Sequence, residues 1–238
     1  EHGQKIQRAA EKKNIIPLEF CNQISQTFRD LSKTLNLSNT DFIRTTEDRH
    51  KKTVQYLWSE LEKNDDIYLS KYSGWYSVSD EAFYSEDEIT DKNEKKISRE
   101  SGSYVEWIEE ESYFFRLSKW QDKLLDYYEK NSEFISPKSR KNEVVSFVKS
   151  GLKDLSISRK TFSWGIKVPN NPEHVIYVWL DALTNYISAL NYPDTNDILF
   201  KNFWPASVHL IGKDILRFHA VYWPAFLMAA KIPLPQKI

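Results

Sequence analysis

Residues 208–230 read VHLIGKDILRFHAVYWPAFLMAA, and this stretch decides the predicted fold. Residues 208–211 form a short apolar run, which predicts a buried strand. Gly212 permits a sharp turn of the backbone, and Asp214 can cap a helix that begins at Ile215. A strand that leads through a tight turn into a helix is typical of α/β sheets, in which ligands bind beyond the carboxyl ends of the strands.

The predicted helix carries polar groups on one face. Ile215, His219 and Tyr222 are spaced at i, i+4 and i+7, so they share that face and can line an apolar cleft. Lys213 adds a cation at the turn, where helix amides favour anionic groups. A mixed face of this kind is more often core packing than a ligand site. The stretch alone therefore indicates an α/β protein with a candidate ligand cleft.

A second stretch repeats the pattern, because residues 174–190 read HVIYVWLDALTNYISAL. The β-branched and aromatic residues 175–178 predict a strand, and Asp181 stands at the expected N-cap of a helix over 182–190. Trp179 follows the strand, where it either lines a site or seals the core. Two such units predict neighbouring parts of one parallel sheet.

Composition limits the class of protein. The 238 residues are 40% hydrophobic, which is enough to bury the core of one large or two smaller domains. A net charge of -1 does not favour a nucleic-acid surface, so no DNA partner is predicted. The longest apolar run is shorter than the roughly 18 residues of a membrane helix, so no membrane partner is predicted. The single cysteine, Cys21, excludes an intramolecular disulfide and favours a reducing, cytoplasmic location.

The rest of the chain predicts helices first and strands later. Residues 3–62 place apolar side chains at helical spacing. From about residue 64, alternating segments and turn residues predict short antiparallel strands. The charged stretch 85–111 is interpreted as a solvated face or loop.

Two further helices are predicted from their ends. Ser118 and Gln121 have the spacing of a capping box, which would open a helix through Glu129. The pair Ser136-Pro137 is typical of an N-cap followed by a first-turn proline. Gly151 is placed to end that second helix.

The two stretches first quoted, 174–190 and 208–230, resemble the catalytic domain of the methionyl-tRNA synthetases, which are class I aminoacyl-tRNA synthetases. The opening EHGQKIQRAA is similar to that family's TDEHGQKI segment. Four more blocks agree in order along the chain: FIRTTEDRH (42–50), GWYSVSDEAFY (74–84), ESYFFRLSKWQDKLLDYYE (111–129) and DLSISRKTFSWGI (154–166).

The resemblance implies a fold and a division of the chain. The expected fold is α/β, with a Rossmann-like parallel sheet core split by an inserted α+β connective-peptide domain. Residues 1–63 and 159–238 would belong to the core, and residues 64–158 to the insertion.

The resemblance also implies a reaction: L-methionine and ATP, with Mg²⁺, form methionyl-adenylate, and the methionyl group passes to tRNA(Met). The methionine pocket carried over from the family comprises Trp179, Ala182, Leu183, Tyr186, Ile215, His219 and Tyr222. The ATP site comprises Gly212, Lys213, Asp214 and Arg159, with Arg159 expected to pair with Asp214. No residue is assigned a catalytic role. A thioether is favourable against aromatic rings, and Tyr186 and His219 are expected to offer its sulfur a weak hydrogen bond.

The sequence departs from the family pattern in three places. Family members often carry zinc knuckles in the insertion, but residues 71–88 contain no cysteine and the histidines show no paired ligand spacing, so no structural zinc is predicted. The family's HIGH motif would precede residue 1 and its KMSKS loop would follow residue 238. The 238-residue chain by itself is therefore expected to be inactive.

Two other functions stay open from the sequence. One is a sibling synthetase for valine, isoleucine, leucine or cysteine, although the first three usually carry a much larger insertion. The other is a non-catalytic interaction module derived from a synthetase.

Overall fold

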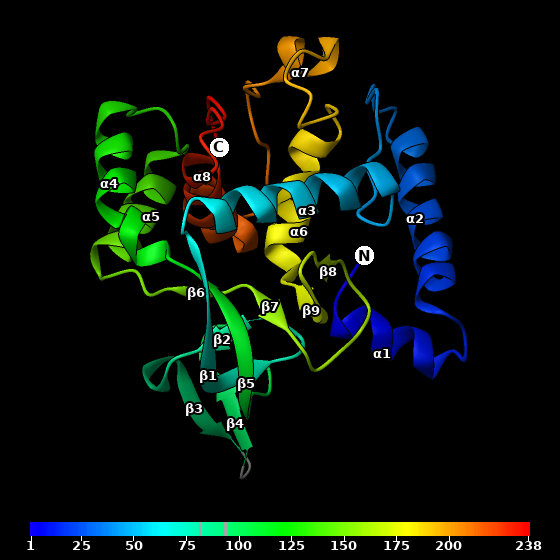
Figure 1. Cartoon of the computed structure of the whole chain (residues 1–238), viewed down its shortest axis with the longest axis vertical. Coiled ribbons are helices and arrows are strands. Elements are labelled where there is room, and N and C mark those ends of the chain that lie inside the picture. Colours follow the sequence, from blue (N-terminus) through cyan, green and yellow to red (C-terminus); the bar gives the residue numbers. More distant parts are fainter. Residues whose placement is uncertain (81, 93–94) are drawn as a thin grey trace.

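Figure 1 shows the computed structural model, which describes residues 1–80, 82–92 and 95–238. Of Tyr72 and Glu110 it describes the backbone alone. The predicted strand block 74–84 and the charged stretch 85–111 therefore each contain residues that lie outside the described ones: 81 in the first, 93 and 94 in the second.

Helices dominate the first quarter of the chain, as predicted, and return after the strands. The α-helices are α1 (Gln4–Lys12), α2 (Pro17–Thr34), α3 (Asp48–Lys63), α4 (Gln121–Lys130), α5 (Lys138–Lys149), α6 (Val178–Ser188), α7 (Ile198–Phe203) and α8 (Trp223–Ala229). Shorter helical turns are the 3-10 turns η1 (Glu86–Glu88), η2 (Leu117–Trp120) and η3 (Lys213–Ile215), and the π-turn η4 (Phe218–Tyr222).

The strands are β1 (Ile67–Ser77), β2 (Ala82–Tyr84), β3 (Ile89–Lys92), β4 (Lys95–Ser98), β5 (Glu106–Phe115), β6 (Leu155–Ser156), β7 (Ser158–Arg159), β8 (Lys167–Val168) and β9 (Asn171–Ile176). They form sheets in the orders β2-β1-β5-β6, β3-β4 and β7-β9-β8. The long β1–β5 ladder pairs Ile67 with Phe115 and Tyr76 with Glu106. Antiparallel strands after residue 64 are thereby confirmed.

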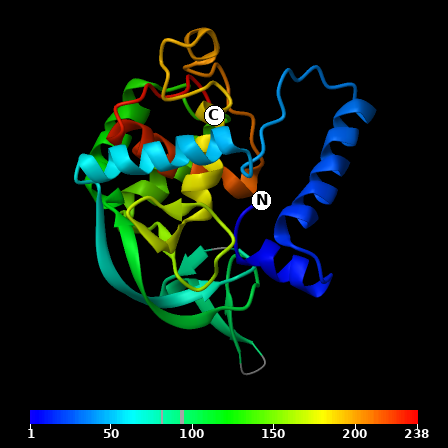
Figure 2. The same ribbon diagram turned by 45° about the vertical axis from the view of Figure 1, so that its right-hand side comes forward.

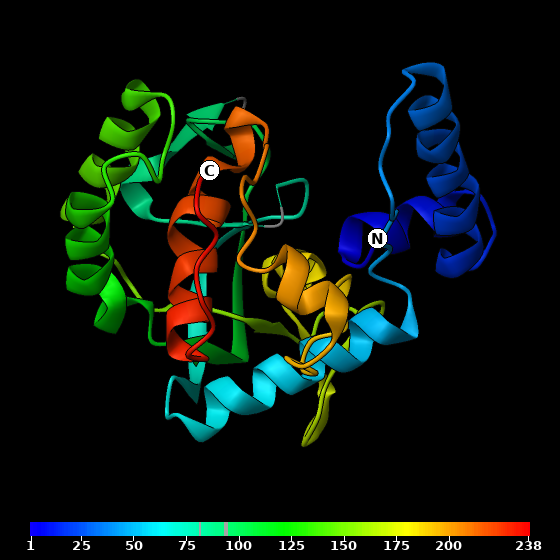
Figure 3. The ribbon, with the colours of Figure 1, turned by 90° about the horizontal axis from the view of Figure 1, so that it is seen from above.

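The core lies where α3 crosses α6 and where the helical segment 213–229 packs beside them (Figure 1). α3 buries Val54, Leu57, Trp58 and Leu61, which recur at three- and four-residue spacing and so form one apolar stripe. Figures 2 and 3 show α1 and α2 standing to one side of this body. The core therefore fixes α6 and the 213–229 segment, which carry the predicted site.

The predicted parallel sheet is not formed among the strands that the structure describes, since every described pair is antiparallel. The strand predicted at 175–178 ends at Ile176, in β9, which lies between β7 and β8. The strand predicted at 208–211 is wrong: the segment has no ladder, and the His209 amide donates instead to the Lys237 carbonyl. An apolar run becomes a strand only where a neighbour satisfies its amides.

Both predicted helix caps of the quoted stretches are wrong. α6 begins at Val178 with Tyr177 at the N-cap, so Asp181 lies inside the first turn and is buried. Gly212 occupies the N-cap of η3, and Asp214 lies within that turn without a capping bond. Asp181 does not cap because its carboxylate is used by two histidines, described below.

The later helices differ from prediction at their starts. Ser118 donates to Asp154 and Gln121 accepts from the Leu152 amide, so the predicted capping box is wrong. α4 nevertheless ends within a residue of the predicted Glu129.

α5 begins at Lys138, one residue later than predicted, with Pro137 at the N-cap. Gly151 follows its end with φ 104°, which confirms the predicted stop. Within 85–111, β3 and β4 pair as antiparallel strands and bury Ile89 and Ile97, while the other residues of β3 are exposed, so this part is a solvated face made of strands rather than a loop.

Candidate functional site

The site predicted from the sequence lies between two helical segments. α6 carries Trp179, Ala182, Leu183 and Tyr186, and the segment 213–229 carries Ile215, His219 and Tyr222. α6 packs against η4, so the two groups face one another. Of the residues that the resemblance assigned to one pocket, ring contacts and hydrogen bonds join Trp179, Tyr186, Ile215, His219 and, through Phe218, Tyr222.

An aromatic stack closes one end of this site. The ring centroids of Trp179 and Phe218 are 3.6 Å apart with 7° between the planes, and His219 meets Trp179 edge-on at 6.4 Å. The rings of Tyr222 and Phe218 meet edge-on, with their centroids 5.5 Å apart. Phe218 was not predicted as a site residue. It lies three residues after Ile215 and four before Tyr222, and this helical spacing could have placed it on the same face.

A chain of hydrogen bonds fixes the polar groups of the site. The Ile215 carbonyl accepts a bond of 2.9 Å from Nδ1 of His219, so Nε2 of the neutral ring accepts the Tyr186 hydroxyl at 2.8 Å. Burial lowers the pKa of His219, which favours the neutral ring, and burial raises the pKa of Tyr186 to about 12. The hydroxyl proton of Tyr186 and the Nδ1 proton of His219 are thus both donated to acceptors within the protein. The weak hydrogen bond predicted toward a ligand sulfur is therefore not offered in this arrangement.

His209 is a second imidazole in the cluster that sequence reasoning missed. It stacks on Tyr186 at 3.9 Å, and its Nε2 accepts from the Trp223 indole at 3.2 Å. Burial, followed by the nearby His219, lowers the pKa of His209 to about 4. The sequence contained a signal for His209, because a histidine inside an apolar run is often buried. In the structure His209 is buried, whereas its neighbours Val208 and Leu210 are exposed.

Gly212 and Lys213 line a groove of about 400 Å³ beside this cluster. His209 and Leu216 line the same groove, so His209 separates it from Tyr186. No side chain approaches within 4 Å of the position that a Cβ on Gly212 would take, so the backbone there is open. Lys213 and Asp214 are exposed. The turn thus presents a cation and bare backbone to an open groove.

Arg159 lies apart from that turn. Its guanidinium is buried 4.6–5.3 Å from the ring centres of Phe83, Tyr177 and Tyr76. It donates to the Ser158 carbonyl at 2.6 Å and to Ser156 at 2.8 Å. Asp214 is also a described residue, and the predicted ion pair between it and Arg159 is not formed.

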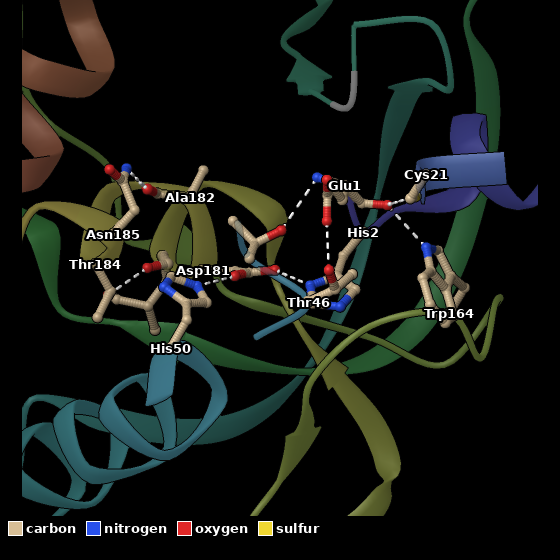
Figure 4. A network of polar contacts seen from close by, with 12 residues as sticks. Glu1, His2, Cys21, Thr46, His50, Trp164, Asp181, Ala182, Thr184 and Asn185 are labelled. Atoms are coloured by element: carbon tan, nitrogen blue, oxygen red, sulfur yellow. Dashed lines mark hydrogen bonds and ion pairs between the residues drawn. The ribbon is translucent and has the colours of Figure 1, made fainter. Parts of the chain in front are cut away.

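A buried network, drawn in Figure 4, holds the first turn of α6 from outside the pocket. Each oxygen of the Asp181 carboxylate binds one histidine at 2.6 Å: Oδ2 meets Nδ1 of His2, and Oδ1 meets Nε2 of His50. Burial alone would raise the pKa of Asp181, but the bonds from the two imidazoles outweigh it and lower that pKa. Nδ1 of His50 reaches the Ser188 hydroxyl at 2.8 Å, at the other end of α6.

The described residues also bear on metal binding and on membrane insertion. They contain no group of three or more His, Cys, Asp or Glu side chains that could hold a metal ion. Over the same residues, no helix has the length and apolar character needed to cross a membrane.

The family of the chain is settled by comparison with known proteins. The family model described as tRNA synthetases class I (M) matches residues 1–238. The chain belongs to this family. The class I (M) synthetases similar to it include the methionine–tRNA ligase of Rickettsia prowazekii (strain Madrid E), which is 64% identical over 238 residues. That of Brucella melitensis biotype 1 is 57% identical over the same length. The resemblance stated from the sequence is confirmed.

Solved class I (M) structures agree. The Mycobacterium tuberculosis methionyl-tRNA synthetase bound by methionyl-adenylate matches all of this chain with a TM-score of 0.98 at 50% identity, over 47% of that chain. The apo form of that enzyme matches 92% of this chain with a TM-score of 0.87. The chain spans 46% of the length of the Rickettsia and Brucella relatives.

Proposed function

We propose that the intact protein activates L-methionine with ATP and transfers it to tRNA(Met). An oxygen of the methionine carboxylate attacks the α-phosphorus of ATP, and the bond to the bridging oxygen breaks, so that pyrophosphate leaves and methionyl-adenylate remains. A hydroxyl of tRNA then attacks the acyl carbon and releases AMP. The observation that carries this proposal is the aromatic site between α6 and η4, in a chain whose relatives are named methionine–tRNA ligases.

The proposed pocket suits a thioether side chain. Trp179 and Phe218 offer a flat aromatic wall, and Leu183, which is 1% exposed, closes the helix side with Ala182. Sulfur next to aromatic rings gains about 0.3–1.5 kcal/mol. Because Tyr186 donates to His219 and His219 donates to the Ile215 carbonyl, neither of these two side chains presents a free proton to the ligand. Selection of methionine would then rest on shape and on the soft contacts of sulfur.

The proposed nucleotide site is the turn at Gly212. The backbone of Gly212 leaves room for a close approach, and Lys213 places a cation where phosphates would lie. Asp214 is exposed on the same turn and suits a ribose hydroxyl. Arg159 is buried among the rings of Tyr76, Phe83 and Tyr177, so we assign it an indirect role in packing β7 against β1 and β2.

ATP is expected to carry Mg²⁺ on its own phosphates. The described residues supply no carboxylate cluster for a resident ion. The proposed organisation of the intact protein keeps residues 1–63 and 159–238 in a Rossmann-like domain and residues 64–158 in a connective-peptide insertion. The β1–β5 ladder with α4 and α5 supports the α+β character of that insertion.

Calorimetric titration of the intact protein with methionine, isoleucine and leucine tests the function. We expect methionine to bind at least tenfold more tightly than the other two. Trp179→Ala should weaken methionine binding by about tenfold or more, because it removes the stacked wall. Trp107→Ala, which removes an exposed tryptophan of β5, is the matched control. Equal affinity for the three amino acids would favour a sibling synthetase, and no binding of any would favour an interaction module.

A further inference from the structure

The helical segment that forms one wall of the site contains a π-turn directly before a proline. Within η4 the Trp223 amide donates to the Phe218 carbonyl, five residues back rather than four. In an α-helical register the amide of residue 224 would donate to the Ala220 carbonyl. Residue 224 is proline, which has no amide hydrogen. The Ala220 carbonyl, which lies inside the π-turn, therefore lacks the backbone donor that an α-helix would give it.

The hydroxyl of Tyr128 donates a hydrogen bond to the Ala220 carbonyl, to which Pro224 has no amide hydrogen to donate. This hydroxyl lies 2.5 Å from the Ala220 carbonyl oxygen, although the two residues are 92 positions apart. Tyr128 is 1% exposed, and burial raises the pKa of its hydroxyl far above the ordinary value, so the group stays protonated and donates. A buried carbonyl without a donor would destabilise this register.

The π-turn sets the direction of the site residues. His219 directly precedes Ala220, and its ring is aimed by the bond from Nδ1 to the Ile215 carbonyl, one turn earlier. An α-helix advances about 100° per residue, so loss of the extra residue of the π-turn would rotate His219 away from Tyr186 by about that angle. A second contact holds the same segment, because the Arg217 guanidinium lies 4.4 Å from the ring centre of Phe147 in α5.

We infer that Tyr128 is a positioning residue of the site: its hydroxyl, from α4, holds the π-turn that aims His219 at Tyr186. The inference rests on the proposed function only for the identity of the ligand. It couples the region 64–158, to which Tyr128 belongs, to the pocket wall.

The test uses three variants of the intact protein. Tyr128→Phe keeps the ring and removes the donor. We expect methionine affinity to fall about three- to tenfold, as for one lost buried hydrogen bond, with ATP affinity unchanged. Tyr127→Phe, in the neighbouring half-buried tyrosine, should leave methionine affinity as in the wild type. In the double variant Tyr128→Phe/Pro224→Ala, the amide introduced at position 224 can donate to the Ala220 carbonyl, so the thermal midpoint should recover. Methionine affinity should stay low, because an α-helical register would then replace the π-turn.

A second readout needs no ligand. Nitrogen-15 spectra of His219 in the free protein should show a protonated Nδ1 and an accepting Nε2 in the wild type, and a changed pattern in Tyr128→Phe. Wild-type methionine affinity together with an unchanged His219 spectrum in that variant would overturn the inference. If the wild-type protein binds no methionine, the proposed function fails, and the His219 spectrum still decides the role of Tyr128.

Discussion

Asp181 offers the sharpest test of what holds the pocket helix. The change Asp181→Asn keeps the shape of the side chain but removes its charge. Asp181 is 1% exposed, and each of its oxygens meets a histidine nitrogen at 2.6 Å. The amide oxygen of asparagine can still accept from one imidazole, either His2 or His50. Its NH₂ group then points at the other imidazole, where an acceptor stood before.

The expected cost follows from those two bonds. A hydrogen bond to a charged group is worth about 1.5–3 kcal/mol, and breaking a buried ion pair costs about 3–5 kcal/mol. Since Asp181→Asn weakens one bond and reverses the other, we expect the free energy of unfolding to fall by about 3 kcal/mol. Asp126→Asn is the control, because Asp126 forms an exposed i,i+4 pair with Lys130 and should cost about 0.5 kcal/mol or less.

The pH dependence adds a second criterion. The folded-state pKa of Asp181 lies below its unfolded value of about 3.9. Its contribution to stability is therefore fully present above about pH 5 and is lost as the pH falls through the folded pKa. Urea unfolding of the intact protein, followed by tryptophan fluorescence, should show a gap between wild type and Asp181→Asn that is still present at pH 5 and narrows below about pH 4. A gap under about 1 kcal/mol at pH 7 would refute the account.

Three further outcomes are expected. Burial lowers the pKa of His209 to about 4, against about 6.5 in the unfolded chain. As the pH falls from about 6.5 to about 4, the unfolded chain therefore binds a proton that the folded chain does not, and the free energy of unfolding falls by up to about 3 kcal/mol. His209→Phe should flatten that part of a urea-unfolding pH series. A methyl group at Gly165 would overlap the buried side chain of Val175, so Gly165→Ala should lower the free energy of unfolding by about 1–3 kcal/mol in urea titrations. Tyr186→Phe should weaken methionine binding about fivefold in calorimetry, since His219 loses its donor.

Local spacing predicted much of the fold but not its sheet. The helices of residues 3–62 and the antiparallel strands after residue 64 are present, and Gly151 ends a helix where expected. Pairing partners are set by contacts between distant segments, which spacing does not contain. For this reason residues 208–211 have the composition of a strand but form no ladder, and the His209 amide donates to the Lys237 carbonyl instead.

The residues of the site were predicted from the resemblance to the family, but their geometry follows from how distant segments pack in the structure. Trp179, Tyr186 and His219 do lie together, but Phe218 and His209, which complete the aromatic cluster, were not named. Their helical spacing and their place in an apolar run were visible in the sequence. What decides between pocket and core is which rings meet, and that depends on how α6 and η4 pack.

The predicted cap at Asp181 fails for a physical reason that lies outside its own helix. An aspartate is a helix cap only while its carboxylate has no stronger partner. Asp181 binds two imidazoles that come from residues 2 and 50, more than 130 positions away. Pro224 likewise ends a local hydrogen-bond pattern, and a hydroxyl 92 positions from Ala220 replaces the missing donor. The pocket helices are thus fixed by buried polar bonds from outside the pocket, so substitutions that never touch a ligand should change how tightly it is held.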